Sequence, residues 1–352
     1  MRRNDEKVVL QMVVRLADVA QAAGVSSATA SRVLNGSARV PAEDIAGRVR
    51  AAAERLGYFP NAQAQALARS SAGLVGLIVH DIADPYFSSI AHGVQHGLRG
   101  SGLRVMLSST DRDGETELEA VRAFMSYRTD GIVLAGSRGL DGEAELAAAL
   151  EMYQKNGGKV VVVGQPLPDT LGLYVDNRGA ATRLVRGLVG LGHRRFVILM
   201  GDAQLKTIEE RKAGFLEGLA EAGIEPLAVL LGAFTRDGGL ETMTRHLEES
   251  ASDLGQGQIC VLAANDVMAL GALTAIRRAG LRVPQDVALA GFDDISTLED
   301  MVPSITTVHL PLDEMGERAG RMLLDGDGDG GDDVQVVAGE PVFRESTAFC
   351  PR

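Results

Sequence analysis

The chain has 352 residues, of which 45% are hydrophobic, and its formal net charge is −12 at pH 7. A chain of this length can bury a large core in two or three domains, and its apolar runs are too short to cross a membrane, which excludes a membrane protein. The charged amino end lacks the apolar stretch of a signal peptide, so we expect a cytoplasmic protein in which Cys260 and Cys350 remain reduced thiols.

The charge is divided unevenly along the chain. Residues 1–70 carry a net charge of +4, and the remainder carries −16. A basic amino end on an acidic body is suited to contact the phosphates of nucleic acid through that end alone.

The first predicted elements are two short helices within residues 16–35, which follow a loose tail over residues 1–14. A tight turn at Gly24 separates the helices, and Ser26 is placed to cap the second one. Their apolar residues form one face, which consists of Val19, Ala20, Ala23, Val25, Ala30, Val33 and Leu34. This pattern is typical of a helix-turn-helix, whose second helix enters the major groove of DNA.

A third helix is predicted within residues 41–56. Its core stripe is expected to consist of Ile45, Val49, Ala52 and Leu56. Pro60 disfavours helix at the residue before it and so ends this segment, after which Asn61 can cap a short stretch over residues 62–68.

From Leu74 onward, short apolar runs alternate with helical stretches. The runs are Leu74–Val79, Leu103–Leu107, Gly131–Leu134, Lys159–Val163, Phe196–Met200, Ile259–Ala263 and Val287–Gly291. The helical stretches include Phe87–Arg99, Ala144–Lys155, Arg178–Leu191, Glu209–Ala222 and Asp266–Ala279. This alternation predicts an α/β fold of parallel sheets covered by helices, and its length favours two lobes with a cleft between them.

Several motifs in this order resemble the LacI/GalR family of bacterial transcription regulators. They are LADVAQAAGVSSATASRVLN at 16–35, GYFPNAQAQALA at 57–68, DPYF at 84–87, VDNRGAA at 175–181, LGHRRF at 191–196, ERKAGF at 210–215, ANDVMALGAL at 264–273, RVPQDVALAGFDD at 282–294 and RESTA at 344–348. The resemblance implies a small all-α helix-turn-helix domain, joined by a hinge helix to a two-lobed body like that of periplasmic binding proteins.

The resemblance also implies domain boundaries and partners. The DNA-binding domain would span residues 15–59, the hinge 60–72, and the effector-binding and dimerisation domain 73–352. Within the latter, the first lobe would contain residues 73–174 and 307–333, and the second lobe residues 175–306 and 334–352. The expected partners are double-stranded operator DNA, a small carbohydrate effector and a second copy of the chain. A dimer is expected because the chain ends at Arg352, without the added helix of the family's tetramers, and no cofactor is expected.

By the same resemblance, the second helix carries most of the DNA contacts. Ser27 and Ala28 match base-reading positions, and Arg32 matches an arginine that reads guanine. Leu67 matches a leucine that opens a central base step of the DNA. It lies in the expected hinge helix, which is too short to be stable alone in water and folds when two copies pack in the minor groove. The remaining expected DNA-binding residues are Ser26, Thr29, Ser31, Asn35, Arg39, Tyr58 and Asn61.

Two features depart from the family pattern. Eight residues separate Val40 from Val49, where the family usually has seven, and an acidic stretch from Glu43 replaces residues that are usually basic. Ala62 stands where the hinge often has an arginine. Both changes predict weaker contact with the DNA backbone.

Ligands of open parallel sheets bind at the carboxyl ends of strands, and carboxylates, arginine and aromatic rings there suit a polyhydroxylated ligand. The candidate effector-binding residues at such ends are Asp84, Tyr86, Phe87, Arg211, Phe234, Asn265, Asp266 and Asp293. The family match points above all to Arg211 and Asp266.

Each of these assignments has a plain structural alternative. Arg32 can be a solvated helix arginine, Leu67 ordinary packing, and Asp266 a helix N-cap. Phe87 and Phe234 can belong to the core.

Two metal-like patterns are set aside. The acidic loop from Asp325 to Asp333 resembles the start of a calcium loop, but Val336 stands where the required glutamate should be. His92 and His96 have metal-like spacing without an evident third ligand.

Two other function classes are compatible with such a body: a solute-binding protein for transport and a sugar-processing enzyme. The helix-turn-helix and the missing signal peptide argue against the first, and the lack of a catalytic motif argues against the second. The sequence leaves open the identity of the effector, the sign of regulation, and whether a co-regulator protein replaces the sugar.

Overall fold

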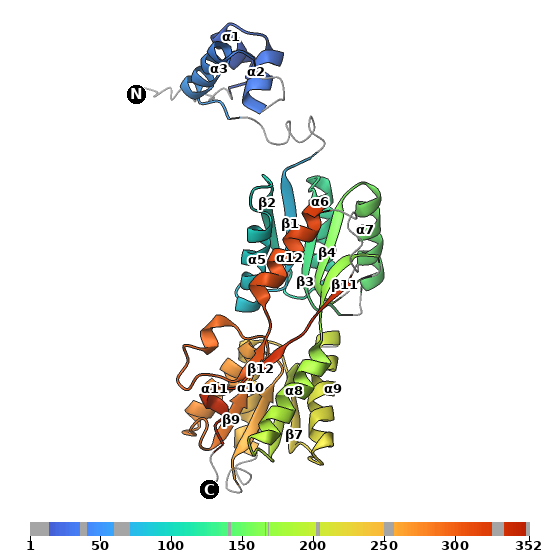
Figure 1. Cartoon of the computed structure of the whole chain (residues 1–352), viewed down its shortest axis with the longest axis vertical. Helices are drawn as coiled ribbons and strands as arrows, with labels where there is room; N and C mark the ends of the chain where they lie inside the picture. Colours follow the sequence, from blue (N-terminus) through green and yellow to red (C-terminus); the bar gives the residue numbers. More distant parts are fainter. Residues whose placement is uncertain are drawn as a thin grey trace, which may run out of the picture. The chain divides into compact units, whose positions relative to one another are not determined.

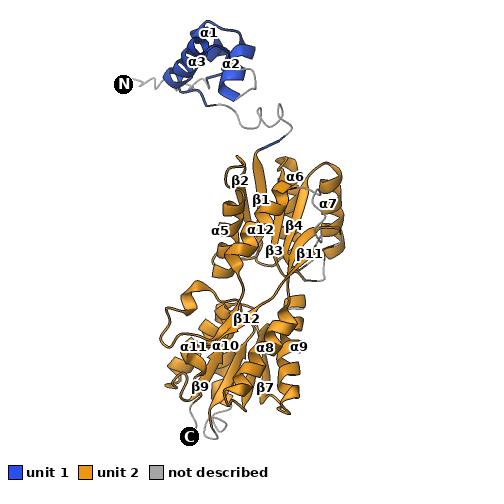
Figure 2. Cartoon of the chain, viewed as in Figure 1, with its two compact units in different colours: residues 1–72 blue, residues 73–352 orange. Residues whose placement is uncertain are grey.

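Figure 1 labels the helices and strands of a computed structural model, which describes residues 14–35, 41–59, 71–139, 142–165, 167, 169–201, 205–249, 257–325 and 334–349. Backbone contacts divide the chain into two compact units, residues 1–72 and residues 73–352 (Figure 2). We call the first unit the head and the second unit the body, and each is described by itself.

The head consists of the three helices α1 (Leu16–Ala23), α2 (Ser27–Asn35) and α3 (Glu43–Leu56). Gly24 ends α1 in the left-handed conformation, with φ 67° and ψ 40°, which glycine adopts without steric cost. The N–H of Val25 then donates to the carbonyl oxygen of Ala20 at 3.0 Å. The tight turn predicted at Gly24 is therefore confirmed.

The core of the head is small and rich in alanine. Its buried residues are Val19, Ala20, Ala23, Ala30, Ala46, Val49, Ala52 and Ala53. The predicted apolar face of the first two helices is confirmed, with Val25, Val33 and Leu34 partly buried against this core. In α3 three of the four predicted stripe residues pack in or against this core, namely Val49, Ala52 and Leu56. Ile45 is partly exposed and does not belong to the core.

The body is built from short parallel strands and the helices that cover them. Its strands are β1 (Leu74–Val79), β2 (Arg104–Ser109), β3 (Gly131–Gly136), β4 (Lys159–Gly164), β5 (Leu171–Val175), β6 (Phe196–Gly201), β7 (Ala228–Gly232), β8 (Ile259–Ala263), β9 (Val287–Ala290), β10 (Thr307–His309), β11 (Val334–Val337) and β12 (Glu340–Val342). Its helices are α5 (Pro85–Gly97), α6 (Gly114–Ser126), α7 (Glu143–Lys155), α8 (Asn177–Gly190), α9 (Lys206–Glu221), α10 (Arg236–Glu249), α11 (Asp266–Arg278) and α12 (Leu312–Asp325), with short 3₁₀ turns at Ser296–Leu298 and Glu345–Thr347.

The first lobe, which we define as residues 73–175, 312–325 and 334–337, contains a parallel sheet with strand order β11-β5-β4-β3-β1-β2 (Figure 1). Alternate side chains of β1 point to opposite faces of this sheet. Leu77 packs in the cluster that includes α5 and α12, whereas Ile78 packs with Val121 of α6 and Leu150 of α7. The sheet is buried on both faces, which explains why its strands appear as continuous apolar runs.

The second lobe, residues 176–310 and 340–349, contains a parallel sheet with strand order β7-β6-β8-β9. Helices α8 and α9 pack together beside this sheet, and α10 and α11 form a second pair (Figure 1). All residues of β6, β8 and β9 are buried. The predicted two-lobed α/β architecture is thus confirmed.

The predicted lobe boundaries after residue 306 are wrong at two strands. Strand β10 pairs antiparallel with β12 and bridges to Asp293, so it belongs to the second lobe rather than the first. Strand β11 pairs in parallel with β5 and belongs to the first lobe rather than the second. The physical reason is that β11 completes the hydrogen bonding of the β5 edge, a tertiary contact that four residues of sequence do not signal.

Helices α5 and α12 approach each other closely through glycines. A Cβ added at Gly316 of α12 would overlap the backbone oxygen of Ile90, whereas one added at Gly190 of α8 would meet no atom within 4 Å. We expect Gly316→Ala to lower the free energy of unfolding by about 1–3 kcal/mol, because the helices must separate. Gly190→Ala should instead raise it by up to about 1 kcal/mol through helix propensity. Chemical denaturation of both variants measures these changes, and a neutral Gly316→Ala would contradict the close approach.

Candidate functional site

The start of α2 is shaped by a side-chain cap. The hydroxyl oxygen of Ser26 accepts a hydrogen bond from the backbone N–H of Thr29 at 3.1 Å and lies 2.9 Å from the Thr29 hydroxyl. The predicted cap at Ser26 is confirmed. It leaves the small side chains of Ser27 and Ala28 exposed at the positive end of the helix, where backbone amides can approach a phosphate.

The outer face of α2 carries the residues that were assigned to DNA. Ser27, Ala28 and Arg32 are exposed, while Ala30 on the opposite face is fully buried. The remaining polar residues of α2 that were assigned to DNA, Thr29, Ser31 and Asn35, are partly exposed, and the Asn35 amide donates to the Ser31 hydroxyl at 2.9 Å.

The other residues assigned to DNA lie elsewhere. Tyr58 packs partly buried against the core of the head. Arg39, Asn61 and Leu67 lie outside the described residues, as do the hinge segment 62–68, the expected tail up to residue 13, Cys350 and all of the acidic loop after Asp325.

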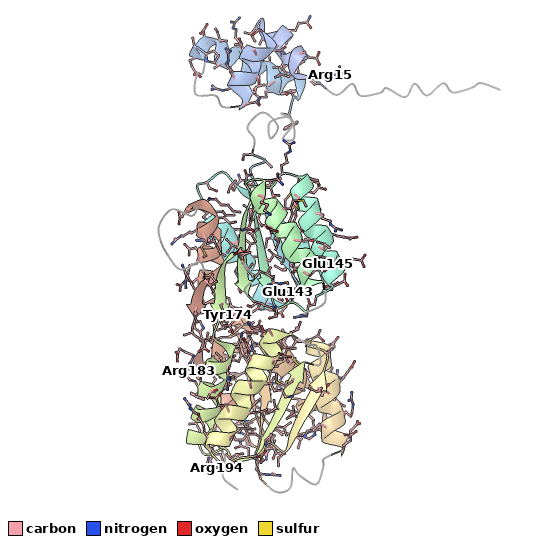
Figure 3. All side chains as sticks on the ribbon, turned by 90° about the vertical axis from the view of Figure 1, so that its right-hand side faces the viewer. Arg15, Glu143, Glu145, Tyr174, Arg183 and Arg194 are labelled. Carbon is pink, nitrogen blue, oxygen red and sulfur yellow. The ribbon has the colours of Figure 1, made fainter. Side chains whose placement is uncertain are left out.

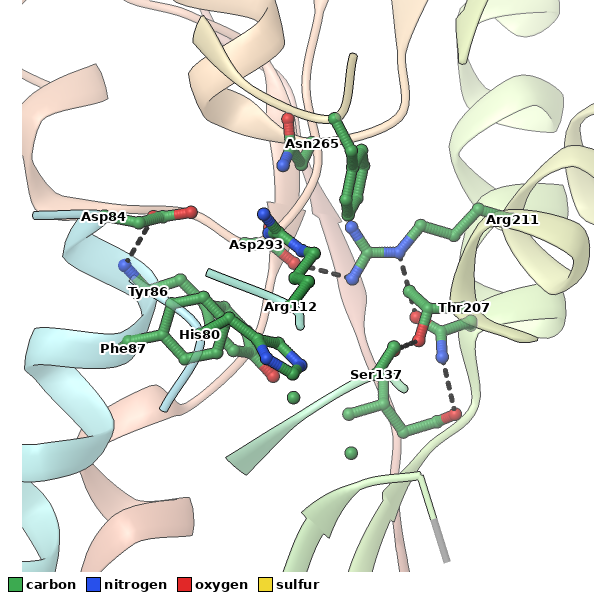
Figure 4. A pocket seen from close by; sticks show the side chains of 15 residues that line it. His80, Asp84, Tyr86, Phe87, Arg112, Ser137, Thr207, Arg211, Asn265 and Asp293 are labelled. Atoms are coloured by element: carbon green, nitrogen blue, oxygen red, sulfur yellow. Dashed lines mark hydrogen bonds and ion pairs between the residues drawn. The ribbon is translucent and has the colours of Figure 1, made fainter. Parts of the chain in front are cut away.

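The body has a pocket between its two lobes, which contains about 470 Å³ of space not filled by protein atoms (Figure 4). The pocket brings together seven of the eight residues that the sequence assigned to the effector, namely Asp84, Tyr86, Phe87, Arg211, Phe234, Asn265 and Asp293. Apart from Arg211, which lies in the second turn of α9, they come from strand ends and helix starts of both lobes, as the strand-end rule predicts.

Arg211 of α9 lies beside Asp293 in the wall of this pocket (Figure 4). Three hydrogen bonds hold its guanidinium. Its guanidinium donates to Asp293 Oδ1 at 2.7 Å, to Asn177 Oδ1 at 2.9 Å and to the carbonyl oxygen of Ala264 at 2.7 Å. It also stacks over the Phe292 ring, with 3.8 Å between its central carbon and the ring centre. Arg211 is 4% exposed and Asp293 is 5% exposed, so the ion pair is buried.

Burial controls the protonation of the pocket carboxylates. Desolvation raises the pKa of Asp293 to about 6, although the neighbouring Arg211 opposes this shift. Desolvation also raises the pKa of Asp84, which caps α5 by accepting from the N–H of Tyr86 at 3.0 Å. Both carboxylates can accept hydrogen bonds from ligand hydroxyls.

Aromatic rings and a second arginine complete the pocket. Phe87 packs edge-on against both Tyr86 and His80, with ring centres 4.9 and 5.5 Å apart. Arg112 of the first lobe lies over the Phe234 ring of the second lobe, 5.2 Å from its centre. Arg112 therefore lies on the aromatic face that a sugar ring would use for stacking.

Asp266, the eighth residue assigned to the effector, does not line the pocket. It is 1% exposed, and its two carboxylate oxygens accept from the backbone N–H of Ile295 at 2.9 Å and the Thr307 hydroxyl at 2.7 Å. Both carboxylate oxygens are thus engaged within the second lobe, and the contact of Asp266 with a ligand stays a prediction. Its neighbour Asn265 caps α11, by accepting from the N–H of Met268, and lines the pocket instead.

Sequence reasoning missed five polar residues of the pocket. Three of them, His80, Arg112 and Ser137, follow β1, β2 and β3, so the strand-end rule applied to every strand would have found them. Asn177 and Thr207 lie at the starts of helices in the second lobe.

Hydrogen bonds also connect the lobes beside the pocket. The hydroxyls of Ser137 and Thr207 share a hydrogen bond, and the Tyr174 hydroxyl donates to the carboxylate of Glu210. Tyr174 lies at the junction of the two lobes (Figure 3).

The chemistry of the pocket is that of binding. Carboxylates, guanidiniums and aromatic faces converge without a group of three or more His, Cys, Asp or Glu side chains that could hold a metal ion among the described residues. In the same part of the chain, no helix has the length and apolar character needed to cross a bilayer. The rings of His92 and His96 are tilted by 53° with 5.4 Å between their centres, and His92 Nδ1 lies 2.8 Å from Asp313 Oδ1.

Comparison with known proteins gives two family-model matches. A model described as "Bacterial regulatory proteins, lacI family" matches residues 15–61, and one described as "Periplasmic binding protein-like domain" matches residues 185–347. The chain is 32% identical over 312 residues to the "HTH-type transcriptional repressor CytR" of Escherichia coli K12, which covers 88% of each chain.

Solved structures agree with these matches. The Lac repressor dimer bound to operator and the anti-inducer ONPF has a TM-score of 0.80 and 27% identity, with 96% of this chain and 99% of that chain covered. The complex of the transcriptional regulator CelR with cellobiose has a TM-score of 0.66 and 29% identity, covering 95% of this chain and 99% of that chain.

The relatives are transcriptional regulators and not enzymes, and the match extends over both the head and the body. The chain is therefore a DNA-binding transcriptional regulator that belongs to the LacI family of bacterial regulatory proteins.

Proposed function

We propose that this chain represses transcription by binding a pseudo-palindromic operator as a homodimer, under the control of a sugar or sugar derivative in the pocket between its lobes. The single observation that carries the proposal is the pocket itself. It combines two carboxylates, two guanidiniums and aromatic faces, contributed by both lobes. Such a set can grip hydroxyls and stack on the face of a sugar ring.

The neighbours support the two partners in this proposal. The similar Lac repressor structure is titled as a dimer bound to operator, and the CelR structure as a complex with cellobiose. In this chain, the exposed face of α2 is the surface that we assign to the major groove, and residues 60–72 are the segment that we assign to the hinge.

The mechanism is a coupling between two sites. A ligand that contacts both lobes favours one arrangement of the lobes, and that arrangement decides how well two heads fit the two halves of an operator. A coupling of about 1–3 kcal/mol changes operator affinity about 5–150-fold.

The proposal is tested by fluorescence anisotropy of the full chain on inverted-repeat DNA with a central CG step. We expect sequence-selective binding that weakens steeply with salt and changes at least fivefold when an effective sugar from a thermal-shift screen is added. Absence of selective binding in every ligand state would contradict the operator assignment. Selective binding that no sugar changes would contradict the effector assignment alone.

The role of Arg32 gives a sharper test of the head. Arg32→Ala should weaken operator binding by about 1–3 kcal/mol and relax the preference for one base pair, because a bidentate contact to guanine would be lost. Arg50→Ala is the matched control, since Arg50 pairs with Glu43 on α3 at 2.9 Å. Equal anisotropy titrations for the two variants would show that Arg32 is only a solvated helix residue.

A further inference from the structure

A second pocket lies in the first lobe, beside the carboxyl ends of β1 and β3 and the starts of α6 and α7. It contains about 730 Å³ of unfilled space, and its charged lining includes Arg112, Glu117, Arg138 and Glu143. Glu143 lies at the end of the first lobe that faces the second lobe (Figure 3). None of these residues except Arg112 lines the pocket described above.

The second pocket contains a buried arginine with unused donors. Arg138 is 5% exposed and donates through Nη2 to the carbonyl oxygen of Gln165 at 2.6 Å. Its Nε and Nη1 atoms have no hydrogen-bond partner within the part of the chain that the structure describes. An unsatisfied buried donor costs free energy, so these two nitrogens favour a ligand that accepts hydrogen bonds from them.

A buried acceptor shares the same pocket. Glu117 of α6 is 6% exposed, and burial raises the pKa of its carboxyl group, while the charge of Arg138 opposes this shift. The lining therefore presents donors from Arg138 and acceptors from Glu117 within one pocket.

The two pockets are neighbours, because His80 and Arg112 line both of them. His80 Nδ1 lies 3.3 Å from the Thr110 hydroxyl, and its Nε2 has no hydrogen-bond partner among the described residues. Burial lowers the pKa of His80 to about 3, so the ring between the pockets is neutral. The His80 ring and the Arg112 guanidinium thus present polar atoms at the border of both pockets.

The charge balance favours hydroxyl groups over an anion. The lining contains two arginines, Arg112 and Arg138, against three carboxylates, Asp113, Glu117 and Glu143. An added phosphate or carboxylate would approach Arg138 but also meet the buried Glu117 carboxylate at a repulsive energy cost. A sugar hydroxyl instead donates to a carboxylate and accepts from a guanidinium at the same time.

We propose that the second pocket is a subsite for a second sugar ring, so that the effector is an oligosaccharide with one ring in the pocket between the lobes and the next ring between Glu117 and Arg138. This inference rests on the proposed sugar effector and adds that the effector contains at least two sugar rings.

Titration calorimetry of the full chain tests the subsite with matched sugars: glucose against cellobiose and maltose, galactose against lactose, and xylose against xylobiose. We expect at least one disaccharide to bind about tenfold or more tightly than its own monosaccharide. The double variant Glu117→Gln/Arg138→Met leaves neither charge buried alone. In this variant the affinity advantage of the disaccharide should disappear, while the monosaccharide affinity stays within about twofold.

Two further variants keep the test decisive. Glu117→Gln alone changes one atom type with little change in shape, and it should reduce the disaccharide gain even if the double variant fails to fold. Glu115→Gln is the matched control, because Glu115 lies exposed on the same helix, and it should leave both affinities unchanged.

Each other result overturns the inference in a recognisable way. If a monosaccharide binds as tightly as its disaccharides, the second pocket does not bind a second ring, and the proposal of a sugar effector is unaffected. An equal loss for both ligands in the variants assigns Glu117 and Arg138 a purely structural role. Tighter binding of glucose 6-phosphate than of any disaccharide, lost in the double variant, would show an anion site instead. If none of these sugars binds, the sugar effector itself is wrong and the subsite falls with it.

Discussion

Replacing Arg211 with methionine is expected to lower the free energy of unfolding of the body by about 3–5 kcal/mol. The substitution removes one partner of a buried ion pair and leaves the Asp293 carboxylate, Asn177 Oδ1 and the Ala264 carbonyl oxygen without their donor. Methionine keeps most of the side-chain volume, so the loss reports electrostatics and hydrogen bonding more than a cavity. Urea denaturation followed by circular dichroism measures the change.

The pH dependence of this loss is a second readout. Arg211 opposes the rise in the pKa of Asp293, so its removal lets that pKa rise further above the value of about 6 in the native chain. A carboxyl group whose pKa is raised on folding stabilises the fold when protonated and loses this contribution as pH increases through the raised pKa. The variant should therefore be less destabilised at pH 5 than at pH 8.

The matched control for Arg211 is Arg236→Met. Arg236 pairs with Asp237 at 3.0 Å, but both side chains are more than half exposed, so the expected change is less than about 1 kcal/mol. A loss at Arg211 no larger than that of the control, or one that does not vary with pH, would show that the buried pair contributes little to the body.

Removal of residues 1–72 is expected to abolish operator selectivity and leave the body folded. The head and the body have separate hydrophobic cores, with Val19 and Val49 in the first and Leu77 and Phe215 among the second. Because specific DNA binding exceeds nonspecific binding by about 10³–10⁷-fold, loss of α2 should reduce operator affinity by at least about three orders of magnitude. Anisotropy on operator and scrambled DNA measures this loss.

The unfolding of the fragment is the control for this truncation. The fragment Gly73–Arg352 should unfold cooperatively, with a midpoint close to that of the body in the full chain. Its response to an effective sugar in a thermal-shift assay should also remain, because all residues of the pocket lie after residue 79. A fragment that is unfolded, or that still prefers operator over scrambled DNA, would contradict the independence of the two units.

The sequence predicted best those strands that are buried on both faces. The runs Leu74–Val79 and Ile259–Ala263 match β1 and β8 at both ends, since a central strand of a covered parallel sheet is apolar throughout. It placed a strand before Phe234 without giving the bounds of β7, a strand at a sheet edge, where Leu231 is 54% exposed and the apolar run is less distinct. Edge strands lack a partner on one side, so their sequences are less constrained to be apolar.

The sequence analysis did not single out helices α10 and α12, because both contain glycines. Helix α12 contains Gly316 and Gly320, and the first turn of α10 contains Gly238 and Gly239, all of which lower helix propensity. The structure shows why they are present, because a Cβ at any of these positions would press on the backbone of a neighbouring segment. The tertiary contact overrides the local preference.

The sequence predicted the chemical types of the residues in the candidate effector site, but not the identity of every one. Asp84, Arg211 and Asp293 converge as the strand-end rule indicates. Asn265 and Asp266 look alike in the sequence, and only the N-cap geometry of α11 decides that Asn265 lines the pocket while Asp266 binds the backbone of Ile295. The DNA-binding and effector roles of these residues stay predictions.

The sequence by itself determined the helix-turn-helix, its turn at Gly24, the parallel α/β body and the chemical character of the pocket, because each depends on local periodicity, backbone conformation or residue type. Only the tertiary structure decided which lobe β10 and β11 join, which acidic residues reach the pocket, and that Glu117 and Arg138 share a second one. These outcomes depend on contacts between segments far apart in the chain, whose energies local sequence patterns do not record.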